Sequence, residues 1–433
     1  MKKVIIMGAG GRDFHNFLTF FKHKEEYEVV AFTAAQVPGI SGRTFPPSLA
    51  GKKYPEGIPI FSEEKLVDLI KQEKVELVNF AYSDVSNEYV CFKAQECLGA
   101  GADFLLLGPE STMLECSKPV IAVTGTRTGV GKSTVTRYVA KLVKSLGLRV
   151  VVVRHPMPYG DLEKQAVQRF EKLEDLDSAE CTVEEREEYE PLIREGFIVF
   201  AGVDYEKIFE KACEEADVVI WDGGNNDFPF VKPGFWITVA DGSRQGHELS
   251  YYPSVVNLAN SDLVLINKAD DLEKVKVIEE NVRKVNKDCK ITVVRSVLKT
   301  SESIKGKKVL VVEDGPSLTH GGVKKAAGLK AAEEQEAIVV DGRDFAVGSI
   351  KHAFEEYGID KAVPALGYYG KQLEDLEETI NKADCDLVLS SSPASIEKIL
   401  SINKPVVRVS YEMEKNDEVD SAVVKFLSQQ GLL

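Results

Sequence analysis

The sequence contains no hydrophobic run long enough to span a bilayer and no excess of basic residues. It has 433 residues, of which 69 are Asp or Glu and 54 are Lys or Arg, so its net charge is −15. This balance argues against a nucleic-acid partner, although one local basic pocket for phosphates is compatible with it. The N-terminus, MKKVIIMGAGG, continues directly into strand and turn patterning, so we interpret it as a first strand and not as a signal peptide. We therefore expect no association with membranes.

Cysteine spacing excludes further classes of protein. The seven cysteines show no paired spacing, and Cys91 and Cys97 are too widely separated for a CxxC site. Cysteines of this kind are typical of a reducing compartment. The sequence therefore predicts a cytoplasmic protein.

Low-complexity linkers and short repeats are missing as well, and the chain shows a regular alternation of strand and helix patterns. A chain of this length exceeds one ordinary core. The alternation predicts an α/β fold built on parallel sheets. We predict three segments: a Rossmann-like domain at residues 1–117, a P-loop nucleotide-binding catalytic domain at 118–306, and a C-terminal α/β domain at 307–433.

The central segment opens with IAVTGTRTGVGKST at residues 121–134. A β-branched run leads into a glycine-rich turn, and the turn opens a helix, which aims backbone N–H groups at phosphate. Lys132 is predicted to reach the β- and γ-phosphates, and the Ser133 hydroxyl to bind Mg²⁺. The predicted nucleotide-binding residues of this loop are Gly125, Thr126, Arg127, Thr128, Gly129, Val130, Gly131, Lys132, Ser133 and Thr134.

A second metal ligand is expected at the end of strand 218–221. Asp222 follows this buried strand, and an acid in that position after a phosphate loop is the usual second carboxylate for Mg²⁺. Asn225 and Asn226 come after the paired glycines 223 and 224 and are candidate substrate ligands. The paired glycines let the backbone approach a γ-phosphate.

Two other strand-end loops carry candidate catalytic groups. Arg154 and His155 end strand 149–153 and open a proline-rich loop that also contains the candidate substrate ligands Tyr159 and Asp161. Arg244 and His247 follow strand 236–240. These last two either hold substrate phosphate and stabilise transferred charge, or belong to a polar loop with caps.

The next strand, 263–266, ends in Asn267-Lys268-Ala269-Asp270. This NKxD sequence resembles the guanine-recognition motif of GTPases. A carboxylate such as that of Asp270 pairs with two adjacent donors on guanine, and adenine offers no such pair. The motif favours GTP, while ATP stays open as the nucleotide.

The first segment carries a weaker glycine cluster. Gly8, Gly10 and Gly11 follow the first strand, but Asp13 stands where a dinucleotide fingerprint has its third glycine, so binding of NAD(P) competes with a structural or substrate-binding role. Arg12, Asp13 and His15 are either substrate ligands or ordinary caps.

Two further stretches leave their roles open. The acidic stretch 162–195, with Thr182 and Glu185 spaced as a capping box, predicts a solvated helical face without chemistry. In the third segment, the loop 313–322 contains Thr319 and His320, which are candidate phosphate ligands or members of a capped turn.

The central segment resembles dethiobiotin synthetase and its relatives. Residues 125–133 look like their phosphate loop, Arg154-His155-Pro156 with Gly160 resembles their Lys-Pro-Val loop, and Asp222-Gly223-Gly224 stands where they carry an acid and paired glycines. The resemblance implies that a substrate attacks the γ-phosphate. An arginine at 154 in place of lysine suits a more anionic substrate.

The whole chain is similar to archaeal and bacterial proteins described as cyclic 2,3-diphosphoglycerate synthetase-like or as predicted GTPases. The similarity rests on MGAGGRDFHNF at 7–17, VRHPMPYGDLEKQAVQRF at 153–170, WDGGNNDFPF at 221–230 and EDGPSLTHGG at 313–322. It implies ATP-dependent closure of an intramolecular phosphoanhydride with release of ADP and phosphate. The resemblance to P-loop enzymes of this kind also leads us to expect a homodimer.

We therefore predict an NTP-dependent synthetase that activates a small anionic phosphorylated acid, with Mg²⁺ and ATP or GTP as cofactors. The predicted catalytic residues are Lys132, Asp222, Arg154, His155 and Arg244. A regulatory or chaperone-type GTPase without a small-molecule product is the alternative, and a dinucleotide-dependent oxidoreductase is a third interpretation. The polar loops that follow strands in two segments favour the synthetase, because a switch protein needs few substrate-binding groups.

Overall fold

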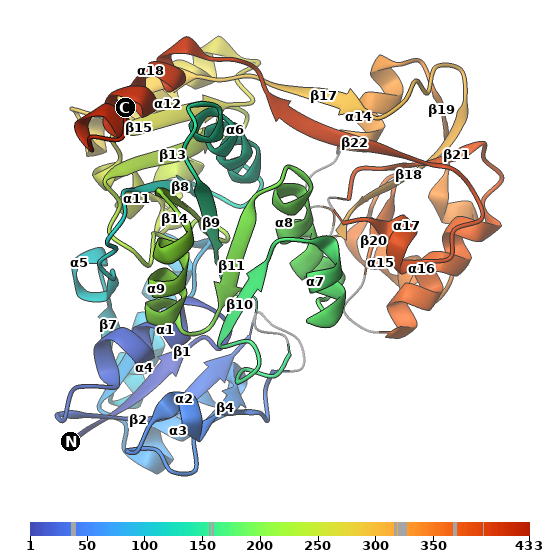
Figure 1. The fold of residues 1–433 in the computed structure, drawn as a ribbon. Helices are drawn as coiled ribbons and strands as arrows, with labels where there is room; N and C mark the ends of the chain where they lie inside the picture. Colours follow the sequence, from blue (N-terminus) through green and yellow to red (C-terminus); the bar gives the residue numbers. More distant parts are fainter. Residues whose placement is uncertain are drawn as a thin grey trace. The chain divides into compact units, whose positions relative to one another are not determined.

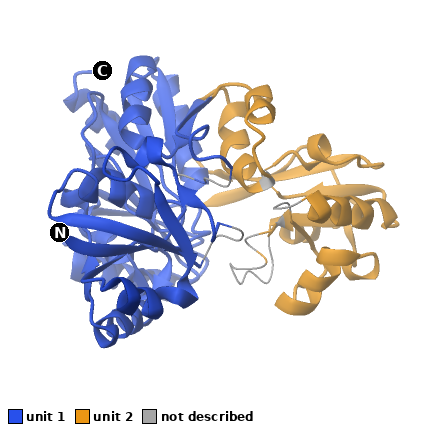
Figure 2. Ribbon diagram, turned by 90° about the horizontal axis from the view of Figure 1, so that it is seen from below, with its two compact units in different colours: residues 1–169, 198–294, 416–433 blue, residues 170–197, 295–415 orange. Residues whose placement is uncertain are grey.

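The computed structural model describes residues 1–35, 40–155, 157, 160–315, 318, 327–366, 370–392 and 394–433, and the backbone alone of Val183 and Asp314. The chain forms two compact units (Figure 2). The first comprises residues 1–169, 198–294 and 416–433, and the second comprises residues 170–197 and 295–415. The three predicted domain ranges stay a prediction, because this division does not separate the first two of them.

The first unit begins with a sheet of order β3-β4-β2-β1-β5-β7. All its pairs are parallel except β3–β4. Alternate residues of β1 face different cores, since Val4 and Ile6 pack with Phe14 while Ile5 and Met7 pack with Val78. Helices therefore cover both faces, as in a Rossmann-like sheet. The elements are β1 (Lys2–Met7), α1 (Arg12–Asn16), β2 (Tyr27–Ala34), β3 (Thr44–Phe45), β4 (Ile58–Ser62), α3 (Leu66–Glu73), β5 (Leu77–Phe80), α4 (Asn87–Ala100) and β7 (Asp103–Leu106).

The second sheet of this unit has the order β10-β11-β9-β12-β8-β13-β15-β16 (Figure 1). The phosphate-loop strand β8 lies between β12 and β13 and is parallel to both. Because β9, β12, β8, β13 and β15 are parallel, their carboxyl ends meet at one edge. The elements are β8 (Val120–Gly125), α6 (Lys132–Ser145), β9 (Val150–Arg154), β10 (Val167–Phe170), β11 (Ile198–Gly202), α9 (Tyr205–Glu215), β12 (Val218–Asp222), β13 (Phe235–Asp241), α11 (Ser254–Asn260), β15 (Leu263–Asn267), α12 (Leu272–Val285) and β16 (Lys290–Val293).

The helix α18 (Asp417–Gln429) completes the first unit. It packs against α6, where the Tyr138 hydroxyl donates to Asp420 Oδ1 at 2.5 Å and accepts from the Asn416 N–H at 2.9 Å. The ring of Phe426 stacks on that of Phe235 with their centroids 5.6 Å apart. The helix that follows the phosphate loop is thus supported by residues far away in sequence.

The second unit is built on a sheet of order β17-β22-β21-β18-β19, with β20 paired to β18. β17 and β22 are antiparallel, and the other pairs are parallel. The alternation of strands and helices predicted for the third segment is confirmed. The elements are α7 (Leu173–Ser178), α8 (Val183–Arg194), β17 (Ser296–Thr300), β18 (Lys308–Asp314), α14 (Ala327–Glu334), β19 (Ile338–Val340), α15 (Gly348–Tyr357), β20 (Val363–Ala365), α16 (Gly370–Lys382), β21 (Leu387–Ser390), α17 (Ile396–Ile399) and β22 (Val406–Met413).

The acidic helix α8 differs from its prediction. Thr182 and Glu185 do form the predicted capping box. However, the predicted solvated face is wrong, because the glutamates at 184, 185, 187 and 190 are buried. The hydroxyl of Ser392 donates to Glu187 at 2.6 Å, and the Ser395 N–H donates to Glu190 at 3.0 Å. These glutamates therefore hold the loop after β21 within the second unit.

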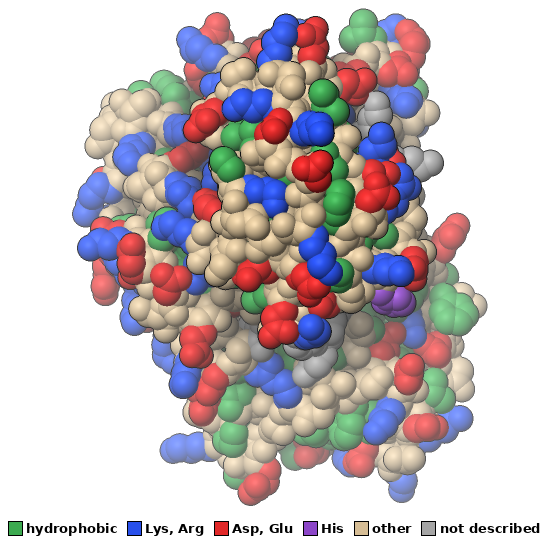
Figure 3. Space-filling view, turned by 90° about the vertical axis from the view of Figure 1, so that its right-hand side faces the viewer, with side chains coloured by type: hydrophobic (Ala, Val, Ile, Leu, Met, Phe, Trp, Pro, Cys, Tyr) green, Lys and Arg blue, Asp and Glu red, His purple; other side chains and the backbone are tan. Residues whose placement is uncertain are grey.

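Over the parts of the chain that the structure describes, no helix combines the length and the apolar character that a membrane crossing requires. The face drawn in Figure 3 carries acidic and basic side chains interspersed with one another.

Candidate active site

The phosphate loop follows β8 as predicted, and α6 begins at Lys132. Gly129 and Gly131 adopt positive φ angles of 77° and 102°, which favour glycine. A side chain at 131 has no space either, because its Cβ would lie 2.3 Å from Asn267 Nδ2. The glycines of this turn are therefore required by its geometry.

The NKxD motif lies against this loop. Asn267 Nδ2 donates to the Val130 carbonyl at 2.9 Å, and Lys268 Nζ donates to the Gly129 carbonyl at 2.6 Å. Asp270 is exposed at the end of the same strand. Two members of the motif thus fix the loop's backbone, and the third is open to solvent, where a base can approach.

Lys132 is buried, and its ammonium donates to the Asn225 carbonyl. Burial lowers the pKa of Lys132 to about 8, and the charges of Asp222 and Asp84 oppose this shift. Asn226 is also buried. Its Nδ2 donates to the Thr126 carbonyl at 3.2 Å and to Ser254 Oγ at 3.0 Å. The segment after β12 is thereby fixed to the phosphate loop.

Arg154 and Asp222 form a buried ion pair at the carboxyl ends of adjacent strands. The carboxylate oxygens of Asp222 are buried and make no hydrogen bond among the described residues. His155 packs against Gly224, where a Cβ would lie 2.6 Å from the imidazole Cδ2. Burial, reinforced by Arg154, lowers the pKa of His155 to about 3, so its imidazole is neutral at pH 7 and adds no positive charge.

Arg127 and His247 meet above the loop. Arg127 Nη1 lies 2.9 Å from His247 Nδ1, and its guanidinium lies 3.5 Å from the centre of the Tyr251 ring. Burial lowers the pKa of His247, and the charges of Arg127 and Arg244 lower it further. His247 is therefore a neutral partner for Arg127.

Arg244 also contacts the phosphate loop. Its Nη2 donates to the Thr128 carbonyl at 2.9 Å, and its Nε donates to Asp241 Oδ2 at 2.8 Å. Burial would raise the pKa of Asp241, but the charges of Lys268 and Arg244, together with the hydrogen bonds from Ser243, outweigh burial and place the pKa below its usual value. Asp241 is thus a carboxylate that holds two cations at this edge.

Sequence reasoning missed several residues of this edge. Asp84, which follows β5 of the first sheet, accepts from Arg127 and from the Thr128 N–H at 3.2 Å. Asn257 of α11 donates to the Gly125 carbonyl at 3.2 Å, and Ser254 donates to the Thr126 carbonyl. Asp84 comes after a parallel strand, as do the site residues that the sequence did predict. This position is the only feature of the sequence that indicates a role for Asp84.

Arg12 is held in a buried network of contacts within the protein. It forms an ion pair with Asp227 at 2.9 Å, donates to Thr112 Oγ1 at 3.3 Å and to the Phe228 carbonyl, and is buried. These contacts join the two sheets of the first unit. Its predicted contact with substrate would require this network to open, so the geometry favours a structural role for Arg12.

The glycine cluster after β1 is occupied by the protein itself. Asp13 Oδ1 accepts from the N–H groups of Gly10 at 2.8 Å, Gly11 at 3.1 Å and Phe14 at 2.7 Å. These amides are the ones that a pyrophosphate would need. The geometry therefore favours the structural interpretation over the binding of NAD(P).

The remaining predicted ligands fall into three groups: one in a local turn, three outside the described residues, and the others at the phosphate loop. Asp161 is exposed and accepts from the Glu163 N–H at 2.9 Å, which is a local turn. Tyr159, Thr319 and His320 lie outside the described residues. Thr128 Oγ1 donates to Asn225 Oδ1 at 3.0 Å, so a predicted nucleotide-binding residue and a candidate substrate ligand lie in contact. Ser133 and Thr134 open α6 as predicted.

A nucleotide and Mg²⁺ fit this edge. The loop offers backbone N–H groups and Lys132 to phosphates, and Asp222 is a buried carboxylate that pairs with Arg154 and accepts no hydrogen bond among the described residues. Ser133 is exposed on the first turn of α6. No cluster of three or more His, Cys, Asp or Glu able to hold a metal occurs among the described residues.

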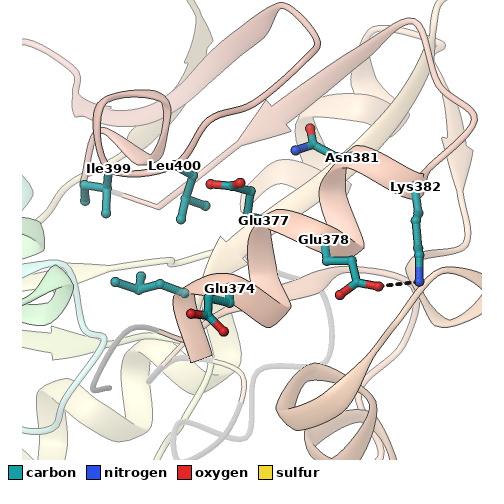
Figure 4. A pocket seen from close by; sticks show the side chains of 8 residues that line it. Glu374, Glu377, Glu378, Asn381, Lys382, Ile399 and Leu400 are labelled. Atoms are coloured by element: carbon teal, nitrogen blue, oxygen red, sulfur yellow. Dashed lines mark ion pairs between the residues drawn. The ribbon is translucent and has the colours of Figure 1, made fainter. Parts of the chain in front are cut away.

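A hollow on the second unit is chemically different. It is lined by α16 and by residues 399 and 400, and Figure 4 shows the carboxylates of Glu374, Glu377 and Glu378 around it. Glu378 pairs with Lys382 at 2.5 Å. It contains no glycine-rich turn, so we assign it no part in nucleotide binding.

The chain is similar to several known proteins. Arginine synthetase ArcE of Thermococcus kodakarensis is 53% identical over 420 residues, which cover 96% of this chain and 94% of the relative. Cyclic 2,3-diphosphoglycerate synthetase of Thermococcus sibiricus is 26% identical over 249 residues, which cover 52% of this chain and 56% of the relative. The structure of LpxK from Aquifex aeolicus in complex with ATP shares 12% identity and a TM-score of 0.42 over 78% of this chain and 95% of that one. No family model matches the chain.

The fold and the phosphate loop define an NTP-dependent enzyme of the P-loop class, and its relatives are synthetases. The predicted relationship to cyclic 2,3-diphosphoglycerate synthetases is confirmed. Within this class, the chain belongs to the arginine synthetase ArcE family.

Proposed function

We propose that the protein uses an NTP to form arginine. The observation that carries this proposal is the 53% identity with arginine synthetase ArcE across 96% of this chain. The phosphate loop supports it, because a P-loop synthetase drives an unfavourable bond formation by moving the γ-phosphoryl group to its substrate.

The balance of charges at the site supports a substrate of low net charge. Arg154 pairs with Asp222, Arg244 with Asp241, and Arg127 with Asp84. The arginines at this edge are thus matched by carboxylates, one for each arginine. A zwitterionic amino acid suits such a site better than a diphosphorylated acid does.

The chemistry follows from the product. Arginine differs from the ureido amino acid citrulline by a nitrogen in place of the ureido oxygen. In the first step this oxygen attacks the γ-phosphorus, the bond from the γ-phosphorus to the bridging oxygen breaks, and NDP leaves. In the second step ammonia adds to the ureido carbon, the carbon–oxygen bond breaks, phosphate leaves, and a proton passes to solvent. The guanidinium of arginine is the product.

The residues of the site have matching roles in this proposal. Lys132 and the loop amides bind the phosphates and compensate the charge that develops during transfer. Asp222 and Ser133 would hold Mg²⁺, which would supply Lewis-acid polarisation of the phosphate oxygens. Arg154 and Arg244 orient the substrate, and little covalent chemistry falls on the protein. The nucleotide is ATP or GTP, and the NKxD geometry favours GTP.

The test is product analysis with the full chain. Incubation with citrulline, an ammonium salt, Mg²⁺ and either ATP or GTP is expected to yield arginine and NDP in equal amounts. Lys132→Ala should abolish both products while the circular dichroism spectrum stays unchanged. If no arginine forms with either nucleotide, although the nucleotide is hydrolysed, the proposal is wrong.

Cyclic 2,3-diphosphoglycerate formation is the second candidate, favoured by relatives that are 23–26% identical over 49–72% of this chain. In the same assay, 2,3-diphosphoglycerate would then stimulate release of NDP and citrulline would not. Hydrolysis that is indifferent to every small molecule tested would instead favour the regulatory GTPase.

A further inference from the structure

Two cysteines of the first unit lie in contact although 97 positions separate them. The Sγ atoms of Cys116 and Cys213 are 2.7 Å apart. Cys116 belongs to the segment that leads from the first sheet into β8, and Cys213 lies on α9, which packs on β9, β11 and β12. The contact thus joins two elements of the same unit that the sequence does not bring together.

We propose that Cys116 and Cys213 form a disulfide that closes the 116–213 stretch, which contains the phosphate loop, into a covalent ring. The sulfurs need to approach by only a fraction of an ångström to reach the length of a disulfide bond, about 2.05 Å. The spacing of the seven cysteines gave no indication of this pair, because the contact arises from the packing of α9.

The surroundings of the two thiols suit thiol–disulfide exchange. The hydrogen bond with Cys116 lowers the pKa of Cys213, assisted by Ser117 and the Lys118 N–H, while the same contact raises the pKa of Cys116. Cys213 is therefore the more readily ionised thiol of the pair. Cys116 is partly exposed, so a small oxidant can reach the contact.

The oxidant in this step is a low-molecular-weight disulfide. The Cys213 thiolate attacks one of its sulfurs, and a first small thiolate leaves. Cys116 then loses its proton and attacks Cys213 Sγ, which releases the second small thiolate. Two electrons pass to the small disulfide, and the protein gains one sulfur–sulfur bond.

The experiment uses the reduced full chain treated with oxidised glutathione. Thiol titration in denaturant is expected to fall from the seven cysteines of the chain to five. The protein is then digested, without reduction, by a protease that cleaves after glutamate. Cys116 and Cys213 fall in different peptides, which span residues 116–163 and 211–214. Mass spectrometry should find these two peptides joined, and reduction should release them.

Cys97→Ser is the matched control, because Cys97 is also buried but has no sulfur contact among the described residues. This variant should still form the link, whereas Cys116→Ser and Cys213→Ser should both lose it. The oxidised protein should also unfold at a higher temperature than oxidised Cys213→Ser, and reduction should remove the difference. If all thiols persist, or if another pair is joined, the proposal is wrong.

Discussion

The carboxylate of Asp84 accepts a hydrogen bond from Arg127 Nε at 2.6 Å, across 43 positions of the sequence. Asp84 itself has a left-handed backbone with φ of 59°, and its N–H donates to Asn226 Oδ1 at 2.7 Å and to the Tyr252 carbonyl at 2.9 Å. A strained residue that neighbouring elements hold in place is typical of functional sites. The first sheet thus contributes a residue that positions the phosphate loop of the second.

Asp84→Asn tests this role. Asparagine tolerates the left-handed backbone but removes the charge that holds Arg127 and the Thr128 N–H. Hydrogen bonds to charged groups contribute about 1.5–3 kcal/mol, so we expect kcat/KM for the nucleotide to fall roughly 10- to 100-fold. Steady-state kinetics measures this, with Asp68→Asn on the exposed face of α3 as the control. Unchanged kinetics for Asp84→Asn would contradict the positioning role.

The buried pair of Arg12 and Asp227 is expected to matter for stability. Asp227→Ala leaves a buried guanidinium without its carboxylate, which costs about 3–5 kcal/mol in the free energy of unfolding. Denaturant titration measures the loss. The exposed pair of Arg149 and Asp217 is the control, because Asp217→Ala should cost less than about 1 kcal/mol. Equal costs for the two substitutions would show that the buried pair is not a structural link.

Asp270→Ala tests the choice of nucleotide. If Asp270 pairs with guanine, its removal should raise KM for GTP by about 10- to 100-fold and leave KM for ATP nearly unchanged. Competition kinetics with both nucleotides measures the difference. Asp271→Ala is a matched control, since Asp271 caps α12 by accepting from the Glu273 N–H at 3.0 Å. Equal effects on the two nucleotides, or none, would make the motif a support of the loop alone.

Asp13 gives the expected pH dependence. Burial raises the pKa of Asp13 from 3.8 to about 6, although the N–H groups of Gly11, Gly10 and Phe14 oppose the shift. Between about pH 6 and pH 3.8, the Asp13 carboxyl is therefore protonated in the folded protein but ionised in the unfolded chain. Because the folded state binds this extra proton, Asp13 adds more to the stability of the protein as the pH falls from about 6 to 3.8. We expect the wild type to gain stability relative to Asp13→Asn between pH 7 and pH 4. Thermal unfolding at several pH values measures this, and a relative loss on acidification would contradict it.

Local patterns predicted the phosphate loop, because the strand, the glycines and the helix that make it are contiguous in sequence. The strand-end rule then placed Asp222, Arg244 and Asn267 near it, since the carboxyl ends of parallel strands share one edge. Contacts among these residues did not follow from the sequence. The pairing of Arg154 with Asp222 needed their strands to be neighbours, which depends on strand order.

Contacts between residues far apart in the sequence could not be predicted either, because they also depend on how the elements pack. Asp84 reaches the loop because the first sheet packs near it, and its own neighbours in sequence give no periodic signal. The prediction for the glutamates of α8 was wrong for a different reason. Their composition predicts solvent exposure, but Glu187 and Glu190 are buried against serine donors that lie more than 200 positions further along. Composition cannot indicate such partners.

The position of α18 bears on how the enzyme is made. Residues 416–433 pack against the helix that opens at Lys132, yet they are synthesised after the entire second unit. The nucleotide-binding unit therefore cannot complete its packing while the chain is still on the ribosome short of residue 416. Its maturation is coupled to that of the inserted second unit, whose folding must leave residues 416–433 free to return.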